Sequence, residues 1–224
     1  MNDTAIVDFD GTIFSEGVID LGLLQEISSK YNEILIVSNN SSIAHTTIES
    51  YLSPYLRFVL TPQLLAKAIF QNTSIKTEIC CSKDVLDYLE CNFYSTYGDI
   101  RDILKEISIN SANLFLKENR FEKIAIIGKI NYEEFQKFID CNLFENYILV
   151  AMNRDKFIDS KGISKETALV GDYYDFKSDI GKTSHAFIDL IKNYCKHFDL
   201  NTVSVYGDNS KSDEKLAFSL GIEY

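Results

Sequence analysis

The stretch TAIVDFDGTIF, residues 4–14, decides the fold class and supplies the first side chains of a candidate site. The apolar residues 5–7 predict a buried strand, which ends in two carboxylates, Asp8 and Asp10, followed by Gly11. In an open α/β sheet, ligands bind at the carboxyl ends of the strands. Two acids there, beside a glycine that lets the backbone approach closely, suit a hard metal ion next to a phosphate. The alternative is an ordinary surface turn, in which Asp10 only caps the turn.

Strand and helix signals alternate along residues 1–70. Short, continuously apolar runs at residues 33–37 and 57–60 predict strands of a parallel sheet that is covered on both faces. Apolar positions at helical spacing predict a helix over residues 18–27. Another helix is expected to begin at Pro62, because proline is favoured in the first helical position. This alternation favours a doubly wound, Rossmann-like parallel sheet.

The middle of the chain, residues 71–179, repeats the alternation and looks self-contained. Its expected elements are strands over residues 76–81, 122–127 and 147–152 and helices over residues 83–89, 99–116 and 132–141. Residues 180–224 then resume the first pattern. We therefore expect a core domain of residues 1–70 and 180–224, with an inserted α/β domain of residues 71–179.

A second acidic loop follows the predicted strand at residues 201–206. It reads GDNSKSD and contains Asp208 and Asp213, after which residues 214–220 predict a helix. If the two strands are neighbours in one parallel sheet, this loop lies beside Asp8. Asp213 has a second interpretation as a favourable anion at a helix start.

Three more polar residues complete a phosphoryl-transfer site if they lie near these acids: Ser38, Asn39 and Lys182. Such a reaction needs an in-line nucleophile, positive charge and a proton for the leaving oxygen. A carboxylate can be the nucleophile and form an aspartyl-phosphate, provided that Mg²⁺ and a lysine bring the anions together. Alternatively, Ser38 and Asn39 only cap a helix over residues 43–52, and Lys182 is a solvated surface residue.

Composition narrows the class of partner. The net charge of −11 argues against nucleic acid, so an anionic substrate has to be attracted locally. No stretch approaches the ~18 apolar residues of a membrane span, and no signal peptide is evident, so we expect a cytoplasmic protein. The five cysteines show no zinc spacing.

The motifs as a set resemble the haloacid dehalogenase-like (HAD) hydrolases. Their signatures are matched in chain order by DFDGT (8–12), SNN (38–40), Gly181-Lys182 and GDNSKSD (207–213). SNNSS (38–42) and VAMNRD (150–155) are similar to the NagD / para-nitrophenylphosphatase-like subfamily, which has an α/β cap. Thr183 departs from the proline that this subfamily usually has after Gly-Lys.

The resemblance implies a role for each matched residue. Asp8 would be the nucleophile and a metal ligand, and Asp10 would bind metal through its backbone carbonyl and act as general acid, then base. Asp208 would bind Mg²⁺ directly, with Asp213 in an outer position or bound through water. The phosphoryl group would be held by Gly11, Ser38, Asn39 and Lys182. Asn153 and Asp155 would contact substrate from the cap, or serve only as cap-loop structure.

The implied function is a Mg²⁺-dependent phosphatase that acts on a small phosphorylated metabolite. Two alternatives stay open: phosphotransfer to an acceptor other than water, and a binding or assembly module with little turnover. The resemblance also allows a homodimer formed through the cap.

Overall fold

The structure, a computed structural model, describes residues 2–39, 56–91, 101–119, 123–128, 137, 148–151 and 180–224. The predicted helices over residues 43–52 and 132–141 lie outside these ranges apart from Lys137, and Asn153 and Asp155 lie outside them too. The main strands are β1 (Asn2–Val7), β4 (Glu33–Val37), β5 (Leu56–Leu60), β6 (Lys76–Cys81), β7 (Lys123–Gly128), β8 (Ile148–Ala151) and β9 (Leu200–Tyr206). The helices are α1 (Leu21–Lys30), α3 (Pro62–Asn72), α4 (Lys83–Glu90), α5 (Arg101–Asn119), α8 (His185–His197) and α9 (Lys215–Leu220).

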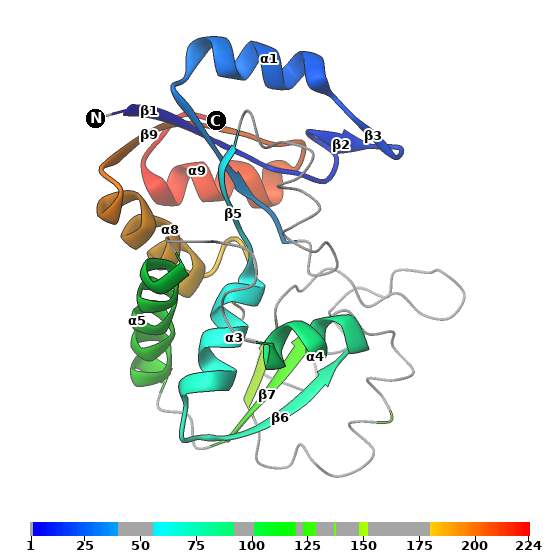
Figure 1. Cartoon of the computed structure of the whole chain (residues 1–224), viewed down its shortest axis with the longest axis vertical. Helices are drawn as coiled ribbons and strands as arrows, with labels where there is room; N and C mark the ends of the chain where they lie inside the picture. The colour runs from blue at the N-terminus through cyan, green and yellow to red at the C-terminus, as the bar shows by residue number, and fades with distance from the viewer. Residues whose placement is uncertain are drawn as a thin grey trace.

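Four parallel strands form the main sheet in the order β5-β4-β1-β9 (Figure 1). In this sheet β1, the first strand of the chain, lies between β4 and β9, and its Val7 pairs with Ile36 on one side and Tyr206 on the other. Because all four strands run the same way, their carboxyl ends meet at one edge of the sheet. The loops that follow β1, β4 and β9 therefore lie together.

Two apolar clusters cover the two faces of this sheet. Along β1, Ala5 and Val7 belong to the cluster that includes Leu24 and Ile27 of α1. Ile6, between them, belongs to the cluster formed with α3, α8 and α9. Alternate residues of one strand are thus buried on opposite faces, as expected for a parallel sheet between helices. This arrangement is the doubly wound fold that the sequence predicts.

A second parallel sheet, in the order β6-β7-β8, comes from the segment predicted to be inserted. Helix α3 contacts α4, α5 and α8, and α5 also packs against α8 (Figure 1). The apolar cluster on this face of the main sheet continues through α3 and α5 to Ile124 and Ile126 of β7. Among the residues that the structure describes, no helix is both long and apolar enough to cross a membrane. The division into core and cap stays a prediction.

The predicted helix over residues 18–27 is wrong at its beginning. Val18 and Ile19 form strand β3 (Val18–Ile19), which pairs antiparallel with β2 (Phe14–Ser15). The chain turns at Glu16 and Gly17, both with a positive φ, and α1 then begins only at Leu21. The side chain of Asp20 fixes that beginning, because its Oδ1 accepts a hydrogen bond of 2.8 Å from the backbone N–H of Leu23.

Candidate active site

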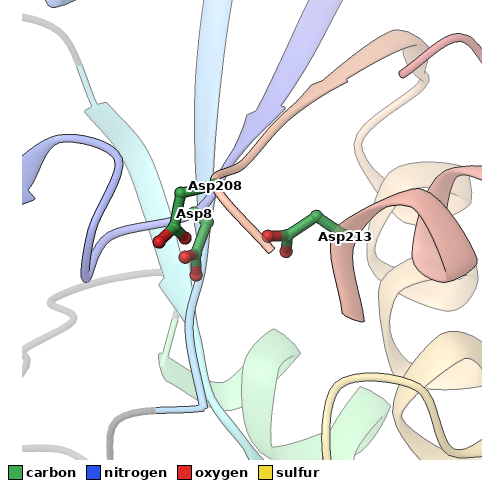
Figure 2. Close-up of side chains that lie close together, drawn as sticks. All are labelled: Asp8, Asp208 and Asp213. Atoms are coloured by element: carbon green, nitrogen blue, oxygen red, sulfur yellow. The ribbon is translucent and has the colours of Figure 1, made fainter. Parts of the chain in front are cut away.

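The carboxylates of Asp8, Asp208 and Asp213 converge at the carboxyl edge of the main sheet (Figure 2). One carboxylate oxygen from each of the three residues lies within 4.8 Å of the other two. Asp8 and Asp208 are neighbours because β1 pairs with β9, and the Asp8 N–H donates a hydrogen bond of 2.8 Å to the carbonyl of Tyr206. Residues from the two ends of the chain thus form one acidic cluster.

Gly11 makes room for this cluster. It has a φ of +83°, and a Cβ on this residue would overlap the Asp208 carboxylate. A hydrogen bond of 2.8 Å from its N–H to the carbonyl of Phe14 closes the turn that brings it there. The absence of a side chain at Gly11 therefore allows the loops after β1 and β9 to approach closely, and it also allows the positive φ of the turn.

Lys182 lies between two of the three carboxylates. Its Nζ is 2.6 Å from Asp8 Oδ1 and also forms an ion pair with Asp213 Oδ1. The lysine side chain is only 2% exposed, so the interpretation of Lys182 as a solvated surface residue is wrong. Two carboxylates around one buried ammonium balance charge that would otherwise be costly to bury.

The backbone of Lys182 is held by a residue from a distant part of the chain. Its N–H donates a hydrogen bond of 2.8 Å to Oδ1 of Asn39, which follows β4 and is 143 positions away. Immediately after the lysine, Ser184 begins α8: its Oγ accepts a hydrogen bond of 3.2 Å from the N–H of Phe187. The side chain of Asn39 therefore positions the lysine loop. Its predicted contact with phosphate, through the backbone, stays a prediction.

Asp10 and Ser38 lie together, beside the three-carboxylate cluster but not in it. Ser38 Oγ is 3.5 Å from Asp10 Oδ2, a long contact for two oxygens, and Ser38 is buried while Asp10 is partly exposed. The side chain of Asp10 is thus separate from the cluster. The roles predicted for Asp10, a backbone carbonyl toward a cation and a carboxyl for proton transfer, stay predictions.

Asp213 is held by its own loop. It is fully buried, in the single π turn η3 (Ser210–Glu214) that precedes α9, and its Oδ2 accepts a hydrogen bond of 3.1 Å from the N–H of Asn209. With the other oxygen on Lys182, both oxygens already have protein partners. Sequence reasoning missed Asn209, whose Oδ1 accepts from the N–H of Lys211. An asparagine just before a helix is a recognisable capping signal.

Burial raises the pKa of Asp8 from its ordinary value of 3.8 to about 6. The charge and hydrogen bond of Lys182 lower the pKa, and the negative charge of Asp213 raises it. Asp8 is therefore mostly ionised at neutral pH, as a carboxylate nucleophile needs to be. A divalent cation beside it would favour the ionised form further.

The residues present fit a hard divalent cation. Carboxylate oxygens are the ligands that Mg²⁺ prefers, and three carboxylates converge here. Within the described part of the chain, the exposed Asp208 carboxylate makes no hydrogen bond or ion pair with the protein. Asp8 keeps carboxylate lone pairs for a cation beside its hydrogen bonds from Lys182 and from the backbone N–H of Phe9. These are the two side chains best placed to be direct ligands.

No protein-family model matches the chain, and no curated protein sequence matches it. Solved structures do match. NagD from E. coli K-12 is 15% identical with a TM-score of 0.59, and the match covers 98% of this chain and 84% of that one. A 4-nitrophenylphosphatase from Thermotoga maritima is 14% identical with a TM-score of 0.58, covering 98% and 83%. A haloacid dehalogenase-like hydrolase from Brucella suis 1330 is 14% identical with a TM-score of 0.59, covering 98% and 82%.

These likenesses define the fold. The chain has the α/β fold of the NagD-like haloacid dehalogenase structures, with a Rossmann-like core and an inserted segment, as its motifs predict.

Proposed function

We propose that the protein is a Mg²⁺-dependent phosphatase that hydrolyses a small phosphomonoester through an aspartyl-phosphate on Asp8. The single observation that carries the proposal is the buried arrangement of Lys182 against Asp8 and Asp213, with Asp208 open beside it. The arrangement supports the proposal because a candidate nucleophile, a fixed positive charge and an open carboxylate lie together at the carboxyl edge of the main sheet. Of the solved structures that share the fold, one is named a 4-nitrophenylphosphatase and another a haloacid dehalogenase-like hydrolase, which supports the proposal.

Asp8 and Asp208 would hold the Mg²⁺ with their carboxylates and Asp10 with its carbonyl, while Asp213 positions Lys182. The cation, when bound, supplies positive charge between the carboxylate and the phosphate. The Asp8 oxygen that accepts a hydrogen bond of 2.6 Å from Lys182 would attack phosphorus with its remaining lone pair, while the second oxygen of Asp8 would bind the cation. That attack forms the bond from Asp8 to phosphorus and breaks the ester P–O bond.

Asp10 provides the proton chemistry of both steps. Its carboxyl donates a proton to the departing alkoxide, and the resulting carboxylate then takes a proton from the water that attacks the phosphorus of the aspartyl-phosphate. Hydrolysis restores the Asp8 carboxylate and releases inorganic phosphate. Ser38, which lies 3.5 Å from Asp10, would donate to a phosphate oxygen.

The test is hydrolysis of para-nitrophenyl phosphate by wild type and Asp8→Asn. Removing a catalytic nucleophile should lower kcat by about three orders of magnitude or more, and EDTA should abolish the wild-type rate until Mg²⁺ is restored. Asp3→Asn is the matched control, since Asp3 is exposed on the same strand and should leave the rate unchanged. A borohydride quench during turnover should convert Asp8 to homoserine. Undiminished turnover by Asp8→Asn contradicts the proposal.

A further inference from the structure

Tyr224 reaches back to the loop that carries two of the three clustered carboxylates. Its hydroxyl donates a hydrogen bond of 3.0 Å to the carbonyl oxygen of Gly207. Gly207 follows β9 directly and precedes Asp208, so this carbonyl belongs to the peptide unit that contains the Asp208 N–H. The Tyr224 hydroxyl thus binds the peptide unit that directly precedes the Cα of Asp208.

The peptides on either side are held by other contacts. The carbonyl of Tyr206 accepts a hydrogen bond from the Asp8 N–H, and the N–H of Asn209 donates to Asp213. Since no hydrogen bond or ion pair from a described residue holds the Asp208 carboxylate, its position depends on its backbone. Rotation of the peptide between Gly207 and Asp208 would move that carboxylate relative to Asp8.

Tyr224 is itself fixed on the sheet. Helix α9 ends at Leu220 and is capped by Gly221, which has a φ of +71°, and the chain then turns back toward β9. The carbonyl of Glu223 accepts a hydrogen bond of 2.8 Å from the N–H of Val205, and Glu223 forms a parallel bridge with Ser204. The tyrosine that follows is therefore anchored one residue away from a strand contact, and it can serve as a support.

We propose that Tyr224 is a positioning residue of the cation site: its hydroxyl fixes the peptide between Gly207 and Asp208 and so holds the Asp208 carboxylate toward Asp8. The inference rests on the proposed function, because it takes these carboxylates as ligands of a divalent cation. Nothing in the motifs that suggested the site includes this tyrosine. Its role follows from the return of the chain to β9.

The test measures cation binding directly, by titrating metal-free protein with Mn²⁺ and following free Mn²⁺ by electron paramagnetic resonance, with Mg²⁺ as competitor. One hydrogen bond of this kind corresponds to about a two- to tenfold change in an equilibrium constant, so Tyr224→Phe should raise the Mn²⁺ dissociation constant by that factor. Tyr224→Ala should raise it no further, because the hydroxyl carries the effect. Ser219→Ala is the matched control: it removes a hydroxyl-to-carbonyl hydrogen bond of 2.8 Å within α9 and should leave the constant unchanged.

The outcomes are distinguishable. If wild type binds Mn²⁺ competitively with Mg²⁺ but Tyr224→Phe binds equally well, the positioning role is overturned and the proposed function stands. The same holds if only Tyr224→Ala loses affinity, which would assign the effect to packing of the ring. If wild type binds no Mn²⁺ that Mg²⁺ displaces, the cation site is overturned together with the inference drawn from it.

Discussion

Replacing Lys182 with methionine should destabilise the metal-free protein, because the carboxylates of Asp8 and Asp213 lose the ammonium group with which both form ion pairs. The side chains of Lys182, Asp8 and Asp213 are 2%, 11% and 0% exposed. Removing one partner of a buried ion pair typically costs about 3–5 kcal/mol, since the remaining charge stays buried. Asp8 borders the open Asp208 and can gain solvent, so we expect a loss near the lower end, about 3 kcal/mol in the free energy of unfolding.

A second substitution separates this electrostatic effect from a change in packing. In the Lys182→Met background, Asp213→Asn removes the carboxylate that is fully buried, while its side-chain oxygen can still accept from Asn209. The double variant should therefore be more stable than Lys182→Met alone, although Asp213→Asn in wild type should be destabilising. Mg²⁺ should reduce the difference in the free energy of unfolding between Lys182→Met and wild type, because a cation bound at Asp8 and Asp208 replaces part of the positive charge lost with the lysine.

The assay is urea unfolding in EDTA, followed by circular dichroism and repeated at saturating Mg²⁺. Lys211→Met is the matched control, since Lys211 is exposed in the same loop as Asp208 and should change stability by less than about 0.5 kcal/mol. A Lys182→Met protein as stable as wild type in EDTA would refute the reasoning. So would a double variant less stable than the single one.

Three further variants or measurements address neighbouring parts of the molecule. Gly11→Ala should raise the Mn²⁺ dissociation constant by about tenfold or more, because a Cβ at a φ of +83° displaces the Asp208 carboxylate; unchanged binding in a titration would contradict this. Asn39→Ala should destabilise the protein by about 1–3 kcal/mol in urea, because the buried Lys182 N–H loses its acceptor; unchanged stability would be inconsistent with that contact. Burial raises the pKa of Cys195 to about 12, so at pH 8 only about one thiol in ten thousand is ionised. Iodoacetamide should therefore spare Cys195 in folded protein and label it in urea, as read by peptide mass spectrometry, and rapid labelling of folded protein would argue against its burial.

The convergence of Asp8 and Asp208 could be predicted because it depends on a general property of parallel sheets. Asp8 directly follows β1, Asp208 follows β9 after the single residue Gly207, and the carboxyl ends of parallel strands meet at one edge of a sheet. Nothing in the sequence states that β1 and β9 are adjacent. The alternation of strands and helices, with acidic loops at both ends of the chain, made that adjacency the simplest arrangement.

The turn between β2 and β3 could not be predicted from periodicity, because Val18 and Ile19 continue the apolar spacing of α1. The local signals that decide it are Gly17 and the capping side chain of Asp20, and they outweigh the spacing. The side-chain contact of Asn39 is different in kind. Its partner is 143 positions away, so no local pattern can reveal it.

The position of Lys182 connects the stability of the core with the chemistry of the site. A lysine that is 2% exposed needs anionic partners, and those partners come from the loops after β1 and β9. The loop after β4 fixes its backbone through Asn39. The loops after three strands therefore have to be folded correctly before the Lys182 ammonium can form its ion pairs. The same three loops carry the residues proposed as nucleophile, cation ligands and phosphate contacts. Substitutions that loosen the site should for this reason also lower the stability of the sheet, and metal-free stability measured alongside turnover is needed to separate the two effects.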